Sequence, residues 1–340
     1  MADYSKILKN LKESPPRELN DHLLIIDSMN TFIRSFSTLR AMNPQGHHIG
    51  GLVGFLRSLG FLVRTIDPTR VICVFDGKGS STNRKNIDPN YKAQRQHTRI
   101  TNWGMYENKQ EEYESLSAQL ERLKDYLECL PLHSLTMEKL EADDIIADLA
   151  LGASASGKQV TIVSSDKDFL QLIDGCISVY SPIKKTLYTK ENITEELEVL
   201  PQNYNIVKAL LGDNSDNLTG VKGLGLKTLI KEFPGLNTNP NYELEDIYTV
   251  CEQNLDGKSI FAKIIHNWDR VKTNYQLMNL HEGQLDDKEI LHTLNVLKEA
   301  VPPLQTGAFL HLLDIDKIEG ITKNTEGWLE NFRTLTVFKQ

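Results

Sequence analysis

Short apolar runs that end at an aspartate are the clearest pattern along this sequence. Three of them occur: residues 23–26 before Asp27, residues 71–75 before Asp76, and residues 160–163 before Ser164, Ser165 and Asp166. Unbroken apolar and β-branched runs of this length are typical of strands buried on both faces of a parallel sheet. Ligands of an open α/β sheet gather at the carboxyl ends of its strands. If the three strands are parallel neighbours, we expect three acids in one crevice, with cations between them to balance the charge.

The remaining pattern predicts an α/β fold: a mostly parallel sheet with flanking helices and a helical C-terminal part. Strand and helix patterns alternate from residue 21 to about 200. Leucines three and four apart over residues 116–130 predict an amphipathic helix that ends before Pro131. Residues 78–110 are polar and lack a period, which predicts a mobile loop or arch. We therefore expect a leader over residues 1–20, helical at first, a catalytic domain over residues 21–200 and a helical domain over residues 201–340.

The distribution of charge qualifies the net charge of the chain. The formal net charge of −8 argues at first against nucleic acid as a partner. Between residues 77 and 101, however, six basic residues accompany a single acid, Asp88. An acidic centre with a basic flank suits a metal-dependent enzyme that acts on a polyanion.

Composition argues against membrane and secreted classes. The longest apolar stretch, residues 50–63, contains Arg57 and is too short to span a bilayer. The N-terminus has no apolar signal core, and the four cysteines are too widely spaced for a zinc site or a Cys-x-x-Cys pair. We therefore expect a cytoplasmic protein with reduced thiols and no membrane contact.

Nine acids fall at strand ends, at one helix start and in one turn: Asp27, Asp76, Glu141, Asp143, Asp144, Asp166, Asp168, Asp213 and Asp216. Glu141 and Asp143 can converge only at the entrance of the helix that they open, because residues two apart do not share a helix face. Oxygen ligands without a histidine or cysteine cluster favour Mg²⁺, with Mn²⁺ as a substitute, over zinc. Two such ions about 3.5–4 Å apart would activate water and stabilise the leaving oxygen of a phosphodiester.

Simpler interpretations exist for each acid taken alone. A single aspartate at a strand end is more often a helix cap or a turn former. Asp143 and Asp144 could be ordinary first-turn acids, and the pair Asp166 and Asp168 could belong to a phosphotransferase. The combined pattern favours a metal site over these interpretations.

Two basic segments predict contacts with phosphate groups. Residues 90–95 look helical, so that Lys92 and Arg95 would share one face and hold the scissile phosphate. The Tyr91 ring could stack on a terminal base. Residues of about 210–233 carry the glycine-rich turn of a helix-hairpin-helix, which positions a duplex through its backbone. The candidate contacts in this turn are Gly220, Lys222, Gly223, Gly225 and Lys227.

Together these motifs resemble the 5′ nuclease, or flap endonuclease, family. The matching segments are residues 26–30 (IDSMN), 75–79 (FDGKG), 91–95 (YKxxR), 141–144 (EADD), 165–168 (SDKD) and 212–217 (GDxxDN), followed by the hairpin. Their order and spacing fit from about residue 21 to 235. The chain is similar to free-standing bacterial or phage 5′–3′ exonucleases, to T-even phage ribonuclease H and to the 5′ nuclease domain of DNA polymerase I.

The resemblance implies a PIN-like fold with a helical arch and two Mg²⁺ ions. By position, it implies that the first ion is held by Asp27, Asp76, Glu141, Asp143 and Asp166, and the second by Asp168, Asp213 and Asp216. Asp144 matches a further acid of bacterial relatives. Lys92 and Arg95 match the phosphate-steering pair of the arch. Arg34 and Lys208 match basic positions near the site, and the hairpin matches one that can hold K⁺.

The implied activity is 5′–3′ exonuclease and flap endonuclease cleavage, with RNase H-type removal of primers in replication. The implied substrates are 5′-flap or nicked duplex DNA and RNA–DNA hybrids. Residues 328–338 are a candidate segment for contacts with a single-strand binding protein or a sliding clamp. The alternatives are a catalytically silent branched-DNA-binding protein and a metal-dependent phosphatase. A phosphatase would leave the hairpin and the motif at residues 91–95 unexplained.

Overall fold

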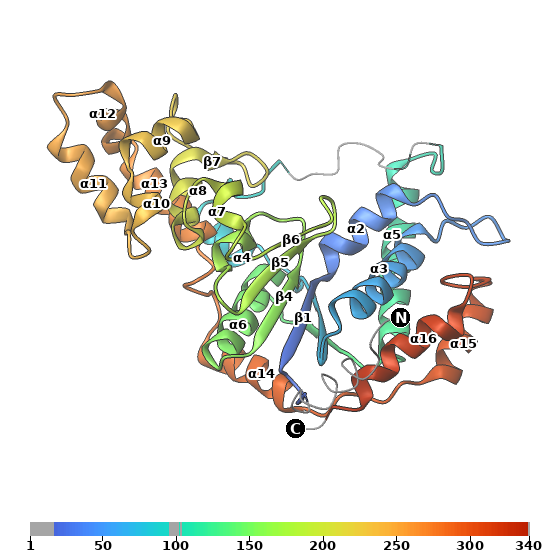
Figure 1. The fold of residues 1–340 in the computed structure, drawn as a ribbon. Coiled ribbons are helices and arrows are strands. Elements are labelled where there is room, and N and C mark those ends of the chain that lie inside the picture. Colours follow the sequence, from blue (N-terminus) through green and yellow to red (C-terminus); the bar gives the residue numbers. More distant parts are fainter. Residues whose placement is uncertain (1–16, 95–101, 103, 339–340) are drawn as a thin grey trace, which may run out of the picture.

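A six-stranded sheet forms the centre of the protein. The computed structural model describes residues 17–94, 102 and 104–338 (Figure 1). The strands, in the spatial order β3-β2-β1-β4-β5-β6, are β1 (His22–Asp27), β2 (Arg70–Phe75), β3 (His133–Thr136), β4 (Gln159–Val163), β5 (Ile177–Ser181) and β6 (Thr186–Tyr188). Neighbours are parallel except β6, which runs antiparallel to β5. The prediction of a mostly parallel sheet, with the three acid-ended strands as neighbours, is therefore confirmed.

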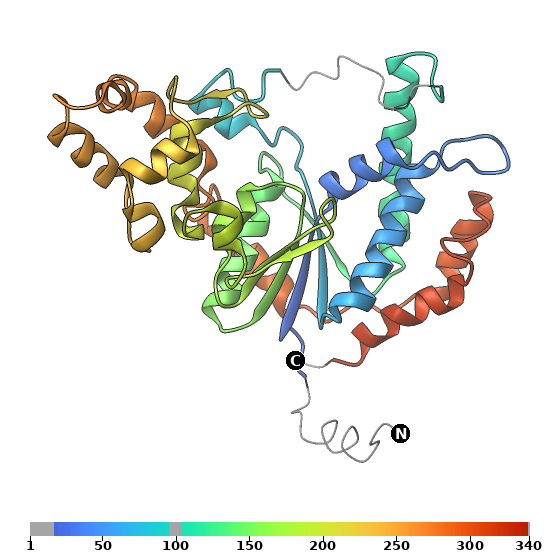
Figure 2. The ribbon, with the colours of Figure 1, turned by 45° about the horizontal axis from the view of Figure 1, so that its top comes forward.

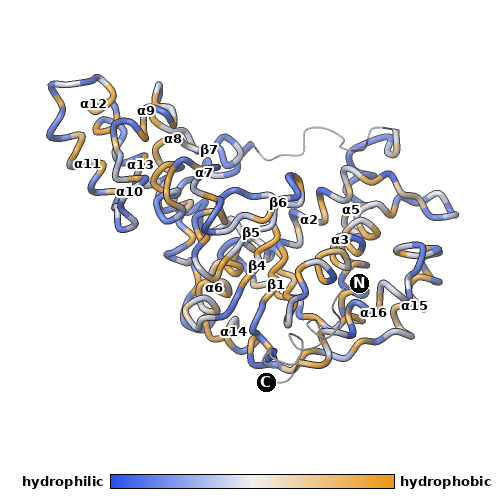
Figure 3. Tube along the Cα trace, in the orientation of Figure 1, coloured by the Kyte–Doolittle hydropathy of each residue, from blue (hydrophilic) through white to orange (hydrophobic). Residues whose placement is uncertain are grey.

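Different helices cover the two faces of the sheet. Successive residues of a strand point to opposite faces, so the inner strands are apolar almost throughout. Leu24 and Ile26 face the core formed with α2 (Ser28–Thr38), α3 (Gly50–Ile66) and α5 (Lys109–Glu128). Leu23 and Ile25 face the core that includes α6 (Ala142–Ala155). In Figure 3 the chain is mostly hydrophobic along β1 and β4 and hydrophilic along the outer loops.

The C-terminal part is mainly helical and reaches both ends of the sheet. Its elements are η2 (Pro201–Asn203), α8 (Tyr204–Leu211), β7 (Gly212–Asp213), β8 (Leu218–Thr219), α9 (Leu226–Glu232), α10 (Gly235–Thr238), α11 (Leu244–Gln253), α12 (Ser259–His266), α13 (Trp268–Met278), α14 (Asp287–Lys298), α15 (Thr306–Ile315), α16 (Thr325–Arg333) and η3 (Thr334–Thr336). Figure 1 and Figure 2 show α9, α11 and α12 at one end of the molecule, with α15 and α16 beyond α3 at the other. α14 packs on α6 and α16 packs on α3. The division at residue 200 stays a prediction. None of the helices within the described ranges has the length and apolar content needed to cross a membrane.

A buried arginine fastens the C-terminal part to the sheet. Arg70, the first residue of β2, is fully buried, and its guanidinium donates hydrogen bonds to the carbonyl oxygens of Val296 (3.0 Å), Leu297 (3.2 Å) and Glu299 (2.7 Å). A buried charge requires such partners. The C-terminal end of α14 is therefore held at the amino end of β2, opposite to the end that carries Asp76.

Two expectations about residues 78–110 are corrected. A short helix, α4 (Thr82–Ile87), lies in the segment predicted to be a loop or arch, so this segment is not a loop throughout. The helix expected over residues 90–95 is wrong for residues 90–94, which form turns. Lys92 has a φ of 54°, which a right-handed helix does not allow, and its N–H donates to the Asp216 carbonyl oxygen at 2.9 Å. Arg95 and the expected helical start of the leader lie outside the described residues.

The segment expected to contact partner proteins belongs to the core. The Trp328 ring on α16 packs against the rings of Phe309 and Phe332, at centroid distances of 5.3 and 4.6 Å. Trp328, Phe332 and Leu335 are all buried. The prediction that residues 328–338 form a partner site is therefore wrong for these side chains of α16 and η3, because they are packed in the core beside α3.

Replacing Gly60 with alanine should destabilise the protein by about 1–3 kcal/mol. A Cβ atom at Gly60 would lie 1.9 Å from Nε1 of Trp328, so α16 would have to move. Urea unfolding followed by tryptophan fluorescence measures the effect. The matched control is Gly152→Ala in α6, where a Cβ meets nothing within 4 Å and stability should rise by about 0.4–1 kcal/mol. Equal effects of both substitutions would contradict the close packing of α16 on α3.

Candidate active site

The carboxyl ends of adjacent strands bring acids to one edge of the sheet. Asp27 closes β1, and its carboxylate accepts a hydrogen bond from the N–H of Asn30 at 3.1 Å. Ser164 follows β4 directly; its hydroxyl donates to Asp27 at 2.7 Å and accepts the N–H of Asp166 at 3.0 Å. One serine therefore ties together the acids that follow β1 and β4.

Asp76 connects this edge to the start of α6. Its carboxylate accepts a hydrogen bond from the N–H of Ala142, the first residue of α6, at 2.9 Å. Glu141 occupies the N-cap position and Asp143 the first turn, where the positive end of the helix dipole favours acids. The start of α6 thus places Glu141 and Asp143 beside Asp76.

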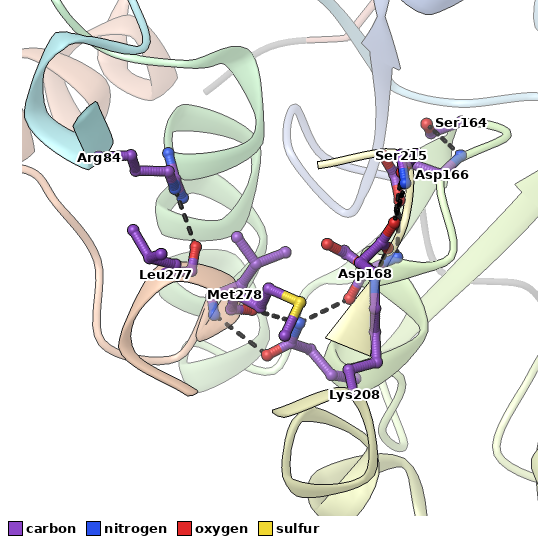
Figure 4. A network of polar contacts seen from close by, with 11 residues as sticks. Arg84, Ser164, Asp166, Asp168, Lys208, Ser215, Leu277 and Met278 are labelled. Carbon is purple, nitrogen blue, oxygen red and sulfur yellow. Dashed lines mark hydrogen bonds and ion pairs between the residues drawn. The ribbon is translucent and has the colours of Figure 1, made fainter. Parts of the chain in front are cut away.

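A second group of acids surrounds Lys208 on α8. Figure 4 shows this side chain reaching toward Asp168, with which it forms an ion pair. Lys208 also lies 2.7 Å from the carboxylate of Asp213. Burial alone would raise the pKa of Asp213, but hydrogen bonds from Lys208 and Ser215 outweigh burial and lower that pKa to about 2. The N–H of Asp168 donates to Asp166 at 2.9 Å, so Asp166 links this group to the first.

In the first group of acids, at the ends of β1 and β4 and the start of α6, the charge of Asp27 and Asp143 is balanced less well by positive partners. Burial raises the pKa of Asp27 to about 7; hydrogen bonds from Ser164 and the Asn30 N–H lower it, whereas the neighbouring carboxylates add to the rise. Burial also raises the pKa of Asp143 well above its ordinary value, with a further contribution from the charge of Asp166. Without added positive charge, these acids resist ionisation at neutral pH.

The donor set fits divalent cations that prefer oxygen ligands. Carboxylates that are buried beside one another gain most from a cation between them. As arranged in the described part of the chain, no three acidic, histidine or cysteine side chains come close enough to hold one ion. Lysines contact the acids instead: Nζ of Lys92 lies 2.7 Å from Glu141, and Lys208 bridges Asp168 and Asp213. An ion held by these acids would displace both ammonium groups.

Asp144 takes part in a buried ion pair, which corrects its assignment as a metal ligand. Arg84 of α4 donates from Nη1 (2.6 Å) and Nη2 (2.8 Å) to the two carboxylate oxygens of Asp144. Its Nη1 also lies 3.2 Å from Glu141. Arg84 is 3% exposed and Asp144 is 1% exposed. Because this bidentate pair uses both oxygens, Asp144 is not free to bind a metal.

Tyr91 is buried, which corrects its assignment as a stacking platform. The residue is 2% exposed and packs with Leu218, Leu277 and Met278. Its hydroxyl donates a hydrogen bond to Glu141 at 3.1 Å. Tyr91 therefore supports an acid of the site and presents no ring face to a base.

The remaining predicted residues lie around the acids. Arg34 stands on α2, about two turns beyond Asp27, and its Nε is buried without a hydrogen-bond partner. Asp216 is buried, and its carbonyl oxygen accepts the Lys92 N–H. The Nδ2 of Asn217 donates to the Asn90 carbonyl oxygen at 2.9 Å. The turn at Lys92 is thereby joined to the turn that carries Asp213 and Asp216.

The glycine-rich turn lies between β8 and α9. Its exposed residues are Lys222, Gly223 and Gly225, and Lys227 is exposed in the first turn of α9. A Cβ atom at Gly220 would lie 2.1 Å from the carbonyl carbon of Leu211, so only glycine fits this close approach. Gly223 has a φ of 86°, which also favours glycine. The turn and the start of α9 therefore present one exposed lysine each, and the backbone of the turn requires its glycines.

Sequence reasoning missed three residues that position the acids: Asn30, Ser164 and Arg84. Asn30 and Ser164 stand next to the predicted strand ends, so a search for capping and hydroxyl partners of the acids could have found them. Nothing in the sequence distinguishes Arg84 from the other basic residues of its segment, because its role depends on where α4 packs.

Replacing Asp27 with asparagine should stabilise the metal-free protein near pH 8 but not near pH 4. The pKa of Asp27 rises from 3.8 in the unfolded chain to about 7 in the folded one. The folded state therefore holds the extra proton between these values, and the wild type loses stability as the pH rises through them. The loss amounts to roughly 4 kcal/mol at most. Urea unfolding in EDTA at pH 4, 6 and 8 measures it.

The control for this comparison is Asp256→Asn, which removes an exposed carboxylate. Its difference from the wild type should not change between pH 4 and pH 8. If the gain from Asp27→Asn failed to grow with pH, the perturbed titration of Asp27 would be refuted.

Replacing Arg84 with methionine should cost about 3–5 kcal/mol of stability. The substitution leaves the carboxylate of Asp144 buried without its partner. Arg84→Met combined with Asp144→Leu should recover most of this loss, because no unpaired charge remains. Lys85→Met, on the exposed side of the same helix, is the control and should change stability by less than about 0.5 kcal/mol. Similar unfolding midpoints for the three variants would contradict the ion pair.

Known proteins are similar to this chain in both sequence and fold. A family model described as the 5′-3′ exonuclease, N-terminal resolvase-like domain matches residues 22–198. The 5′-3′ exonuclease of Bacillus subtilis (strain 168) is 34% identical over 227 residues, which cover 63% of this chain and 71% of that protein. DNA polymerase I of Bacillus caldotenax is 32% identical over 225 residues, covering 64% of this chain and 24% of the polymerase.

A solved structure shares the fold. The bacteriophage T5 D15 flap endonuclease, in complex with DNA and metal ions, aligns with a TM-score of 0.61 and 19% identity, covering 87% of this chain and 99% of that chain. This likeness shows that the fold is that of PIN-like 5′ nucleases. With the family model spanning more than half of its length, the chain belongs to the 5′-3′ exonuclease family.

Proposed function

We propose that this member of the 5′-3′ exonuclease family is a Mg²⁺-dependent enzyme that cuts 5′ ends and 5′ flaps of duplex DNA and RNA–DNA hybrids. The observation that carries this proposal is the convergence of carboxylates from the ends of three parallel strands and the start of α6, with Lys92 on Glu141 and Lys208 on Asp168. Hydrolysis of a phosphodiester needs positive charge around the reacting phosphate, and this site supplies both lysines and acids able to hold cations.

Two groups of acids would hold the ions. The proposed ligands of the first are Asp27, Asp76, Glu141, Asp143 and Asp166; those of the second are Asp168, Asp213 and Asp216. Mg²⁺ would supply activation of water and stabilisation of the leaving oxygen, and Mn²⁺ would substitute. The hydroxyl of Ser164 holds Asp27 and Asp166 in place, and the hydroxyl of Tyr91 holds Glu141.

Lys92 and Lys208 are the residues of this chain that would meet the phosphate. Both ammonium groups lie on carboxylates in the metal-free arrangement. Once ions neutralise those acids, the lysines can turn to an anionic substrate and offset the charge that develops on it. Arg95, which has the same predicted role, lies outside the described residues.

The exposed glycine-rich turn is the proposed contact with duplex DNA. Lys222 and Lys227 would bind the phosphate backbone without reading the base sequence, and the turn would hold K⁺ as a helix-hairpin-helix. The T5 D15 flap endonuclease, which shares the fold, was solved with DNA and metal ions. Removal of RNA primers, action as a monomer and contacts with replication proteins are part of the same proposal. A silent DNA-binding protein and a phosphatase are not favoured, since the acids of the site are intact and the family is an exonuclease family.

The combined substitution Asp166→Asn with Asp168→Asn should lower cleavage of a 5′-labelled flap duplex by at least about 1,000-fold. The two acids belong to different ion sites, and Asp166 links them. Cleavage is measured in Mg²⁺ on flap, nicked duplex and RNA–DNA hybrid, together with binding of the flap in EDTA, which should persist.

The control carries the same change of charge at exposed positions, Asp256→Asn with Glu319→Gln. It should cleave all three substrates like the wild type. Undiminished cleavage by the Asp166 and Asp168 variant would end the proposal, whatever the control shows.

A further inference from the structure

A cavity on the α2 side of the sheet is lined by none of the acids of the site. Its volume is about 520 Å³, and it lies between α2, α3, the end of β4 and the turn from β5 to β6. Its charged lining consists of Arg34 from α2, Arg57 from α3 and Lys185 from the β5–β6 turn. A cavity of this size is typical of small-molecule sites and accommodates a nucleotide.

The charge of the cavity is entirely positive. All residues that line it are described, and none of them is acidic. Arg57 donates Nε–H to the Ile321 carbonyl oxygen at 2.6 Å, which fixes the base of its guanidinium. Lys184, the neighbour of Lys185, forms an ion pair with Glu196. In a chain with a net charge of −8, three cations around one hollow create a local site for an anion.

Two buried polar atoms at the cavity have no partner. Thr31 is 1% exposed, and its Oγ1 makes no hydrogen bond; the buried Nε of Arg34 makes none either. Buried polar groups in folded proteins are almost always satisfied, so such atoms call for an explanation. A ligand oxygen in the cavity would accept from Arg34 and pair with the Thr31 hydroxyl. A phosphate group offers several such oxygens.

Two aromatic rings line the same hollow. Phe61 on α3 is 45% exposed, which is unusual for a residue of this size, and Tyr180 on β5 is partly exposed. Exposed ring faces next to cations are the features on which nucleic-acid bases stack. Phosphate donors and ring faces together match a nucleotide better than an inorganic anion.

The cavity lies beside the acids of the site. Thr31 and Arg34 follow Asp27 on α2 by four and seven residues, which corresponds to roughly 6 and 10 Å along a helix. Val163, at the cavity wall, directly precedes Ser164. A strand with one phosphodiester at the acids can therefore place a nearby nucleotide in the cavity.

We propose that this cavity binds a nucleotide, with its phosphate on Arg34, Arg57, Lys185 and the Thr31 hydroxyl, and its base against Phe61 or Tyr180. The nucleotide is either free or part of a single strand. Occupancy by a strand during cleavage rests on the proposed function, whereas binding itself does not. Binding is therefore tested without divalent ions.

The test compares binding of deoxyadenosine 5′-monophosphate, deoxyadenosine and a 5′-phosphorylated single-stranded oligonucleotide, measured by calorimetry in EDTA. Arg57→Gln with Lys185→Gln should weaken binding of the phosphorylated ligands at least about 10-fold, because two charged phosphate contacts are lost. The matched control, Arg64→Gln with Lys184→Gln, removes the same charge from the same elements outside the cavity and should bind like the wild type. Deoxyadenosine should bind more weakly than its monophosphate.

Thr31→Val provides a second variant that keeps the fold. It removes a hydroxyl that has no partner in the protein, so the unfolding midpoint should stay the same or rise. Binding of the monophosphate should nevertheless weaken.

The choice of ligands distinguishes a site for a free nucleotide from a site for a nucleotide within a strand. Binding of the monophosphate supports a free nucleotide, and binding of the oligonucleotide alone supports a strand. Equal binding by the cavity variant and its control would overturn the proposal, as would no binding of any ligand by the wild type. Cleavage by the Asp166 and Asp168 variant bears on the proposed function only, so the two failures are separable.

Discussion

Repulsion among buried carboxylates is the constraint on which the rest of this structure depends. The parallel strands deliver Asp27, Asp76 and Asp166 to one edge, and Glu141 joins them at the start of α6, so that like charges gather around the buried side chains of Asp27 and Glu141. Cations from distant segments pair with acids of the site: Lys92, from the turn after α4, pairs with Glu141, and Lys208, from α8, pairs with Asp168 and Asp213. The acids therefore draw both the basic segment and the helical part of the chain onto the end of the sheet.

The two groups of acids solve this problem differently, and the difference suits a site that loads cations. Asp213 pairs with Lys208 and has a pKa of about 2, so it is ionised at neutral pH. Asp27 has hydroxyl and amide partners but no cation, and its pKa is about 7. An arriving divalent ion would thus exchange with a proton at Asp27, but with an ammonium group at Glu141 and Asp213. In the proposed function, the exchange of an ion for an ammonium group frees a lysine, which can then contact the anionic substrate.

Features that depend on local sequence could be predicted. Features that depend on which distant residue a side chain or backbone group contacts could not. Strand ends and the acids after them follow from apolar runs, and the start of α6 follows from Glu141 and its neighbours. Asp144 is one residue from Asp143, and only the position of α4 decides that it faces Arg84. The backbone at Lys92 is left-handed because its N–H bonds to a carbonyl oxygen far along the chain. Aromatic residues such as those around Trp328 occur both on surfaces that bind a partner protein and on helices packed in a core, so the sequence alone does not distinguish the two.

The guanidinium of Arg70 limits the order in which the chain can fold during synthesis. β2 is translated long before α14, and this fully buried cation bonds not only to Asn20 and His133 but also to the carbonyl oxygens of Val296, Leu297 and Glu299. Until those residues emerge, dehydrating the cation is unfavourable, so the amino end of β2 must stay open to water. Residues 22–198 contain every strand of the main sheet. We nevertheless expect them to form an incomplete intermediate until a segment that is translated about a hundred residues later becomes available.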